Sequence, residues 1–204
     1  MRATETRYVV PGWGGGELWT SSVAVLAHEF AFEPEQLLAA RPLEGAVGPP
    51  TGTLPGQHTR EADGFVPTSR REPEAAQPPD LDLSLDLDPH ELVARVAAYL
   101  AGADVGFDAV RLDLDDCTPF QRAVAATLRD VPRGTVVSYA ELAALAGYPG
   151  AQRAVGTFCA RNRFAFLLPC HRVVGADGIG GYGSAGVAVK RRLLALEGVT
   201  GLAA

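Results

Sequence analysis

One stretch of this sequence organises the rest: Phe164-Ala165-Phe166-Leu167-Leu168-Pro169-Cys170-His171-Arg172-Val173. Its apolar first half predicts a buried strand that ends at the proline. A cysteine fixed between a proline and a histidine at the end of a buried run is placed as a nucleophile would be, because thiolate is the reactive form and an imidazole can take the thiol proton. On these residues alone, a structural core cysteine with a polar neighbour is the alternative interpretation.

The residues on either side of this stretch predict short helices. One begins at Pro119, and a second is opened by a Ser-x-x-Glu capping box at Ser138 and Glu141. After a turn at 148–150, a third is expected over 151–161, and a last one runs from Lys190 to Leu196. The second and third helices, joined by a short glycine-containing turn, have the helix-turn-helix pattern, with a plain helical hairpin as the alternative.

Charge is distributed unevenly along the chain. The net charge of −6 over 204 residues argues, taken alone, against nucleic acid as a partner. Residues 117–204, however, carry ten basic and four acidic side chains, a net charge of +6, so the first 116 residues carry −12. Arg153, Arg161 and Arg163 fall on or just beyond the third helix. This cluster favours phosphate binding by the basic half over simple solvation.

The N-terminal half is less regular. Residues 7–32 contain alternating and apolar runs broken by Pro and Gly at 11–16, which predicts a hairpin-like strand pair. Residues 34–80 are rich in Pro, Gly, Thr and Glu and predict a disordered insertion, because few apolar residues recur there to offset the ordering entropy. Residues 81–87 alternate at period two, as an edge strand or an acidic tether would. Asp88, with a proline and an acid behind it, then opens a helix.

The composition narrows the class of protein. No segment approaches the roughly 18 apolar residues that span a bilayer, and the N-terminus lacks the pattern of a signal peptide. The three cysteines, Cys117, Cys159 and Cys170, are an odd number and do not form a disulfide framework. We therefore expect a cytoplasmic protein. A single lysine against seventeen arginines, with abundant Ala and Gly, indicates a GC-rich bacterial genome.

From Thr118 to Gly198 the sequence resembles the methylated-DNA–protein-cysteine methyltransferases, also called O6-alkylguanine-DNA alkyltransferases. The ordered set of matching blocks is highly specific, although any single block would be weak. The blocks are Thr118-Pro119-Phe120-Gln121, Val131-Pro132-Arg133-Gly134, Ser138-Tyr139, Arg153-Ala154-Val155-Gly156, Asn162, Pro169-Cys170-His171-Arg172-Val173-Val174, Gly181-Tyr182, Lys190 and Leu193-Leu194-Ala195-Leu196-Glu197-Gly198.

The resemblance implies an α/β (α+β) fold with two domains. The first, at 1–112, would be a divergent, small RNase H-like domain interrupted by the insertion at 34–80. The second, at 113–204, would be a mainly helical, winged-helix-like domain that contains the helix-turn-helix. The resemblance also implies a monomer without a cofactor, associated with the nucleoid. We expect no metal, since the N-terminal cysteines that hold zinc in some members are absent here.

The activity that the resemblance implies is DNA repair by direct reversal. The alkyl group of O6-alkylguanine, and by extension O4-methylthymine, in duplex DNA would move irreversibly to Cys170. The base must first be flipped out of the stack, because the alkyl group lies inside the duplex where a sulfur cannot reach it. The resemblance assigns the proton of Cys170 to His171 through a water, with Glu197 orienting the imidazole. It assigns Asn162 to ordering the turn before the cysteine and to assisting the relay. It assigns Tyr139 to hydrogen-bonding the departing guanine.

The remaining matches concern DNA and the base pocket. Arg153 matches the arginine that enters the stack in place of the extruded nucleotide. The other residues assigned to DNA are Tyr139, Ala154, Gly156 and Arg161. One departure is that Asn162 is followed by Arg163, where the family usually has proline; this loosens the turn or adds a phosphate contact. The positions that match the wall of the base pocket are Val173, Val174, Gly181, Tyr182, Gly183, Ser184 and Lys190.

Other functions are compatible with parts of the sequence. A non-enzymatic binder of alkylated DNA is one, although relatives of that type lack the cysteine. A cysteine hydrolase that turns over would use the same Cys170 and His171, and a transcriptional regulator would use the same helix-turn-helix. Residues 178–183 also fit Gly-x-Gly-x-x-Gly, but no second strand of a dinucleotide-binding unit follows them.

Overall fold

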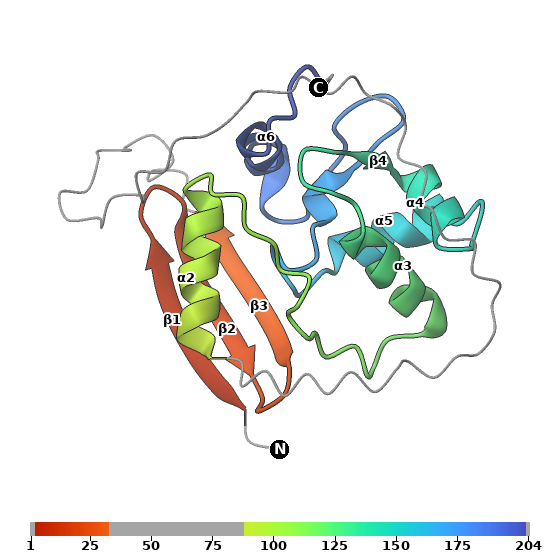
Figure 1. The fold of residues 1–204 in the computed structure, drawn as a ribbon. Coiled ribbons are helices and arrows are strands. Elements are labelled where there is room, and N and C mark those ends of the chain that lie inside the picture. Colours follow the sequence, from red (N-terminus) through yellow and green to blue (C-terminus); the bar gives the residue numbers. More distant parts are fainter. Residues whose placement is uncertain (1–2, 33–87, 203–204) are drawn as a thin grey trace. The chain divides into compact units, whose positions relative to one another are not determined.

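The computed structural model describes residues 3–32 and 88–202, and Figure 1 shows how their helices and strands are arranged. All of them belong to one compact unit, made of residues 1–40 and 85–204. The predicted insertion at 34–80 and the alternating residues 81–87 lie outside the described residues. The domain boundary at 112/113 stays a prediction.

The N-terminal residues form an antiparallel sheet of three strands in the order β1-β2-β3, where a strand pair was predicted. The strands are β1 (Thr4–Val10), β2 (Gly14–Thr20) and β3 (Val25–Phe32). The error came from the glycines at 14–16, which belong to β2 and not to the turn. Gly16 pairs with Tyr8, and a Cβ on Gly16 would overlap the Tyr8 ring. Glycine is therefore used here for close approach, one of the two roles it has inside a strand.

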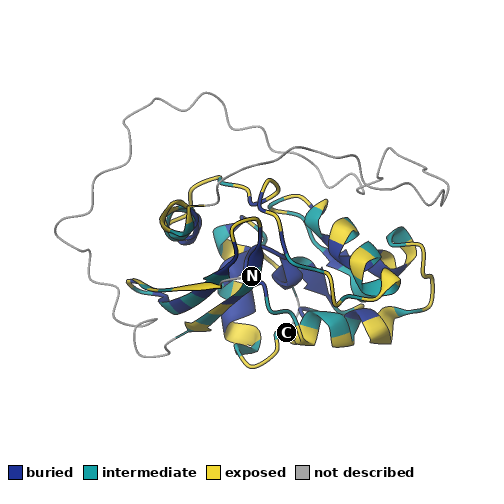
Figure 2. Ribbon diagram, turned by 90° about the horizontal axis from the view of Figure 1, so that it is seen from below, coloured by how far each residue is buried: buried dark blue, intermediate teal, exposed yellow. Residues whose placement is uncertain are grey.

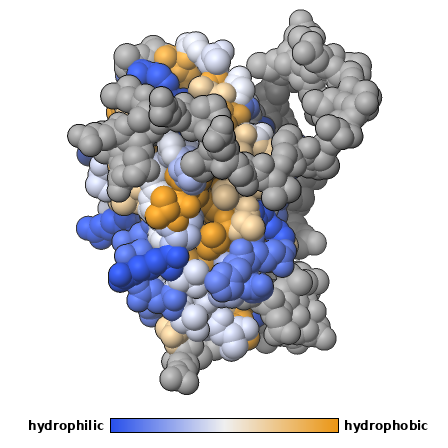
Figure 3. All heavy atoms as spheres, turned by 90° about the vertical axis from the view of Figure 1, so that its left-hand side faces the viewer, coloured by the Kyte–Doolittle hydropathy of each residue, from blue (hydrophilic) through white to orange (hydrophobic). Residues whose placement is uncertain are grey.

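The edge of this sheet carries both charged and apolar side chains. On β1, Arg7 lies 2.6 Å from Glu5 and 3.3 Å from Glu17 of β2, all at the surface. Val9, also on β1, is 69% exposed. Figure 3 shows the face that carries β1, where a narrow apolar patch lies between hydrophilic side chains. Charges on an edge strand of this kind oppose pairing with another sheet.

Helix α2 (Pro89–Leu100) confirms the predicted helix start. The Asp88 side chain accepts a hydrogen bond from the backbone N–H of His90 (2.9 Å), and Pro89 occupies the first turn. The helix packs against the sheet and buries Leu92, Val96, Tyr99 and Leu100. Three of these side chains are aliphatic, whereas Tyr99 brings a hydroxyl group into the core.

The C-terminal residues form the predicted short helices. These are α3 (Pro119–Arg129), α4 (Tyr139–Leu145), α5 (Gln152–Ala160) and α6 (Gly186–Leu196). The capping box of Ser138 and Glu141 is present, with both of its hydrogen bonds. α6 begins at Gly186, four residues before the predicted start. The helices turn their buried residues inward and their exposed residues outward (Figure 2).

The apolar run at 164–168 is not the strand that its composition predicted. It makes one isolated parallel bridge, between Phe164 and His28 of β3, and then turns. Phe166 has a φ of +64°, a left-handed conformation that costs a non-glycine residue roughly 1 kcal/mol or more. Its ring packs among aromatic side chains of the sheet, including Phe30 at 5.2 Å between ring centroids. This packing holds the turn that leads to Pro169.

Two further short elements follow the turn. A single 3₁₀ turn, η1 (Cys170–Arg172), leads into β5 (Val173–Val174), which pairs in parallel with β4 (Val137–Ser138). The predicted nucleophile therefore lies in a 3₁₀ turn between the sheet and the helices. Among the described residues, no helix is both long and apolar enough to cross a membrane.

Candidate active site

Cys170 is held in place by its own loop. It is 8% exposed, and its backbone N–H donates to the carbonyl of Leu168 (2.8 Å). Asn162 donates from Nδ2 both to that carbonyl (2.9 Å) and to Cys170 Sγ (3.1 Å). Its Oδ1 accepts from the backbone N–H of Phe164 (2.9 Å). The Asn162 amide thus fixes both ends of the turn and contacts the sulfur. This is the turn to which the resemblance assigned Asn162.

His171 and Glu197 form a buried pair beside Cys170. Nε2 of His171 lies 3.0 Å from Glu197 Oε1, and both side chains are at most 1% exposed. Nδ1 of His171 is buried and has no hydrogen-bond partner among residues 3–32 and 88–202. Because a carboxylate only accepts, the proton of the neutral imidazole lies on Nε2, and Nδ1 keeps its lone pair. Nδ1 is therefore the atom of this imidazole that is able to act as a base.

The Glu197 carboxylate is surrounded by donors. Besides His171, it accepts from Arg172 Nη2 (2.9 Å) and Nε (3.0 Å), from the backbone N–H of Gly134 (3.3 Å) and from the Tyr99 hydroxyl (2.7 Å). Burial would raise the pKa of Glu197, but the hydrogen bonds from His171 and Arg172 outweigh it and lower that pKa. The carboxylate is therefore charged at neutral pH.

The sulfur and the imidazole are both neutral at rest. Burial raises the pKa of the Cys170 thiol, against the opposing effects of the Asn162 hydrogen bond and of Lys190. Burial also lowers the pKa of His171, against the opposing effect of Glu197. The site therefore does not hold a thiolate–imidazolium pair at rest. A thiol and a neutral imidazole with a free lone pair are able to transfer the proton during the reaction.

Cys170 opens onto a cavity of about 840 Å³. Its walls come from β1, β2, β3, the end of α5, the segment after it up to Ala165, and the loop at 182–185. Of the predicted pocket residues, Tyr182, Gly183 and Ser184 line this cavity, and so does Cys159, which no part of the sequence analysis placed there. The residues Val173, Val174, Gly181 and Lys190 are not among those that line it.

Lys190 instead supports the pocket from within the fold. It is fully buried, and its ammonium donates to the carbonyls of Val173 (2.6 Å) and Gly181 (3.1 Å). The same ammonium lies 6.0 Å from the centre of the Tyr139 ring. Lys190 thereby ties β5 and the loop before Tyr182 to α6, whose C-cap is Glu197.

Tyr139 and the exposed side of α5 face solvent beside this region. Tyr139, the first residue of α4, is partly buried, and burial raises its pKa. A Cβ on Gly180 would lie 3.5 Å from its ring. On α5, Arg153 and Ala154 are exposed, Gly156 is half-buried, and Val155 anchors the helix in the core. Arg161 follows α5 and is exposed.

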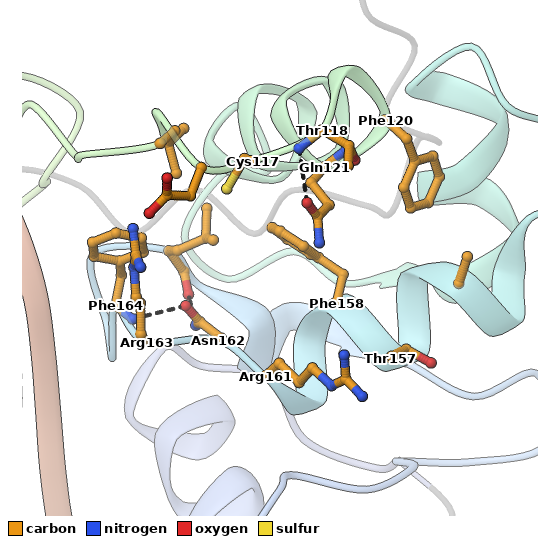
Figure 4. A pocket seen from close by; sticks show the side chains of 14 residues that line it. Cys117, Thr118, Phe120, Gln121, Thr157, Phe158, Arg161, Asn162, Arg163 and Phe164 are labelled. Atoms are coloured by element: carbon orange, nitrogen blue, oxygen red, sulfur yellow. Dashed lines mark hydrogen bonds between the residues drawn. The ribbon is translucent and has the colours of Figure 1, made fainter.

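A second cavity, of about 480 Å³, lies between the start of α3 and the end of α5. Figure 4 shows it with Asn162 and Arg163 at one end and Phe120 at the other. Arg163 is committed to the fold, because its Nη2 donates to the carbonyl of Asp113 (2.9 Å) and its guanidinium lies 5.1 Å from the Phe164 ring centre. The two cavities share Asn162 and the two arginines, 161 and 163.

Comparison with known proteins decides the family. Residues 119–199 match the family model described as the 6-O-methylguanine DNA methyltransferase DNA-binding domain. A methylated-DNA–protein-cysteine methyltransferase of Methanopyrus kandleri is 37% identical over 147 residues, which cover 72% of this chain and 92% of that protein. This chain belongs to the methylated-DNA–protein-cysteine methyltransferase family.

Further relatives agree. One of Methanothermobacter thermautotrophicus is 40% identical over 110 residues, 54% of this chain, and one of Mycolicibacterium paratuberculosis is 46% identical over 106 residues, 52% of this chain. The match spans about three fifths of each of these relatives, 61% and 62%. A crystal structure of Mycobacterium tuberculosis OGT in complex with DNA has a TM-score of 0.61 and 29% identity, and covers 95% of this chain and 92% of that one.

These matches confirm the resemblance and the mixed α/β fold class. They do not test the roles of single residues, which stay predictions supported by the geometry above. Two residues of the buried network around Glu197 were not singled out from the sequence. Arg172 lies in the motif around Cys170, so the sequence placed it near the site without indicating its bond to Glu197. Tyr99 gave no such signal, because a tyrosine on the apolar face of a helix is typical of a core.

Proposed function

We propose that this chain repairs alkylated DNA by direct reversal, moving the alkyl group of O6-alkylguanine in duplex DNA to Cys170, once per molecule. The observation that carries the proposal is the arrangement of Asn162, Cys170, His171 and Glu197. A buried thiol on a wide cavity adjoins an imidazole whose base nitrogen is free and whose other nitrogen faces a charged carboxylate.

The chemistry follows from these groups. His171 Nδ1 takes the thiol proton, directly or through water, and Glu197 stabilises the imidazolium that forms. The sulfur bonds to the alkyl carbon as the carbon–O6 bond breaks, and the electron pair of that bond goes to the guanine oxygen. A hydrogen bond from Tyr139 would help neutralise the leaving base. The thioether is a poor leaving group, so the cysteine is not regenerated.

The substrate side of the proposal rests on α5 and its surroundings. Base flipping needs a side chain to hold the gap in the duplex and a cavity to receive the base. Arg153 is exposed on α5, and the cavity of Cys170 has the volume of a small-molecule site. The Mycobacterium tuberculosis protein of similar fold was crystallised in complex with DNA. We propose the same partner for this chain, and a monomer as the acting species.

Intact-protein mass spectrometry tests the proposal. After incubation with a duplex that contains O6-methylguanine, we expect each protein molecule to gain one methyl group, mapped to Cys170 by peptide analysis. A Cys170→Ala variant should bind the methylated duplex and restore no guanine. Methyl found on Cys117 or Cys159, or transfer that survives in the variant, would refute the assignment. Continued turnover would favour a hydrolase instead.

A further inference from the structure

Tyr99 lies in the core yet makes its polar contacts with the relay. Its side chain comes from α2, 72 residues before His171 and 98 before Glu197. It is 1% exposed. The hydroxyl donates to Glu197 Oε1 (2.7 Å) and lies 3.2 Å from His171 Nε2. The same Oε1 is the oxygen that faces His171, so the three groups form a hydrogen-bonded triangle.

The direction of each hydrogen bond in the triangle follows from the chemistry of the groups. Glu197 is charged and only accepts, so the single proton of the Tyr99 hydroxyl points to it. The hydroxyl oxygen then has lone pairs left to accept from His171 Nε2–H, a bond shared with Glu197. Burial, and next the charge of Glu197, raise the pKa of Tyr99, so the hydroxyl stays protonated and keeps this donor role.

We propose that Tyr99 is a positioning residue of the alkyl-transfer relay, which holds the Glu197 carboxylate in line and keeps the His171 proton on Nε2 so that Nδ1 is free to act. The inference rests on the proposed function, because the relay matters only if His171 takes the proton of Cys170. The hydrogen bonds of the Tyr99 side chain go to His171 and Glu197, so it acts through those two residues.

Packing alone does not account for this tyrosine. Its ring packs against Phe107 (5.7 Å between centroids) and Phe166 (5.8 Å), contacts that a phenylalanine would also make. A buried hydroxyl is unfavourable unless it is hydrogen-bonded, and the partners of this one are Glu197 and His171. A phenylalanine would therefore pack in the core as well as this tyrosine does. What the hydroxyl contributes is its hydrogen bonding to Glu197 and His171.

Charged groups surround the triangle on several elements. Arg172 in η1 bonds Glu197, and the guanidinium of Arg133, in the loop after α3, lies 5.2 Å from the centre of the Tyr99 ring. The Lys190 ammonium disfavours the charged form of His171, and the buried Tyr182 stays neutral because burial raises its pKa. Arg172 favours the ionised forms of Glu197 and Tyr99 and disfavours the His171 imidazolium. Arg133 also favours ionised Tyr99, but the short bond to Glu197 decides the local effect of the hydroxyl. It withdraws charge from the carboxylate and so moderates the proton affinity of His171.

The test compares two variants of α2 with the wild type. Tyr99→Phe removes only the hydroxyl. Val96→Ala removes two methyl groups one turn away, at a residue that is 1% exposed and whose side chain cannot hydrogen-bond to the relay. For each protein we would measure the melting temperature and the single-turnover rate at several pH values, with free O6-benzylguanine and with methylated duplex.

For Tyr99→Phe we expect the rate to fall about tenfold with both substrates, the size expected for a hydrogen bond to a charged group. Without the donor, Glu197 attracts the imidazolium more strongly, so the acid limb of the rate profile should move to higher pH. Val96→Ala should lower the melting temperature and leave the rate and its pH profile unchanged. In a Glu197→Gln background, Tyr99→Phe should slow the reaction by less than twofold.

Three results would overturn the inference: a wild-type rate and profile in Tyr99→Phe, the same pattern in Tyr99→Phe and Val96→Ala, or a full tenfold further loss in the Glu197→Gln background. Failure of the proposed function looks different. In that case the wild type itself would transfer no alkyl group to Cys170.

Discussion

The surroundings of Cys170 and the exposed side of α5 differ in whether their charged and polar side chains have hydrogen-bond partners within the chain. Around Cys170, one amide, one imidazole, one guanidinium and one carboxylate are hydrogen-bonded to one another or to nearby backbone. On α5, the Arg153 guanidinium makes no hydrogen bond or ion pair with any residue the structure describes. The first region is closed by its own hydrogen bonds except at His171 Nδ1, whereas the Arg153 guanidinium has none among the described residues.

The same contrast corrects a conclusion from net charge. Residues 117–204 carry ten basic side chains, but most of these bond within the fold and are not free for phosphate. The guanidinium groups of only Arg153, Arg161 and Arg191 make no hydrogen bond to the described parts of the chain. Those that bond backbone carbonyls or Glu197 are Arg122, Arg129, Arg133, Arg163, Arg172, Lys190 and Arg192. The charge available to the proposed DNA partner is therefore smaller and more localised than the sequence indicates.

The largest effect should come from the closed region. Glu197→Gln removes the charge that stabilises the His171 imidazolium and leaves four donors facing a neutral amide. We expect alkyl transfer to fall about 100-fold or more, equally for free O6-benzylguanine and for duplex, in single-turnover assays. Glu91→Gln, which breaks only a surface ion pair with Arg95, is the matched control and should leave the rate unchanged.

Glu197 also predicts how stability depends on pH. Its pKa is lowered in the fold from the ordinary 4.5, so its stabilising effect is present above that value and is lost as the pH falls below it. Thermal melts between pH 7 and pH 3 should therefore decline less steeply for Glu197→Gln than for the wild type. Parallel curves would mean that the charge of the Glu197 carboxylate does not stabilise the fold.

A smaller and more selective effect is expected on α5. Arg153→Ala should slow repair of duplex by about 10-fold or more and leave the reaction with free O6-benzylguanine unchanged, because the free base needs no flipping. Arg191→Ala removes another guanidinium, from α6, that has no hydrogen-bond partner among the described residues, and it serves as the control for loss of charge. Equal losses on both substrates would show that Arg153 supports the fold or the chemistry.

The smallest effect is expected outside both regions. Deleting residues 38–78 should leave the duplex repair rate within roughly threefold, because the segment is poor in apolar residues and loop length changes the closure entropy slowly. Single-turnover rates and melting curves of both chains decide this. A large loss of rate at an unchanged melting temperature would assign the segment to DNA binding.

Features that depend on neighbours in the sequence were predicted well. The caps of Asp88 and Ser138 were found because a helix start is satisfied by side chains within three residues. Helices α4 and α5 followed from the same local rules. Cys170 and His171 are adjacent, and the resemblance supplied Asn162 and Glu197, which the structure brings to the same site.

Features that depend on distant residues were not. The glycines of β2 were interpreted as a turn, since the Tyr8 ring that requires Gly16 lies on another strand. The run at 164–168 was interpreted as a strand, although aromatic packing on the sheet bends it at Phe166. Tyr99 was missed for the same reason, because its hydroxyl meets partners 72 and 98 residues away. Periodicity shows that a side chain is buried and does not show what it meets.

Lys190 is the single lysine of the 204 residues, and its ammonium is closed off between β5 and the loop before Tyr182. Reagents directed at side-chain amines therefore have one target in this sequence, and they reach it only when that wall opens. The rate of amine labelling at Lys190 therefore measures how often the pocket wall opens locally, and no residue has to be introduced as a probe.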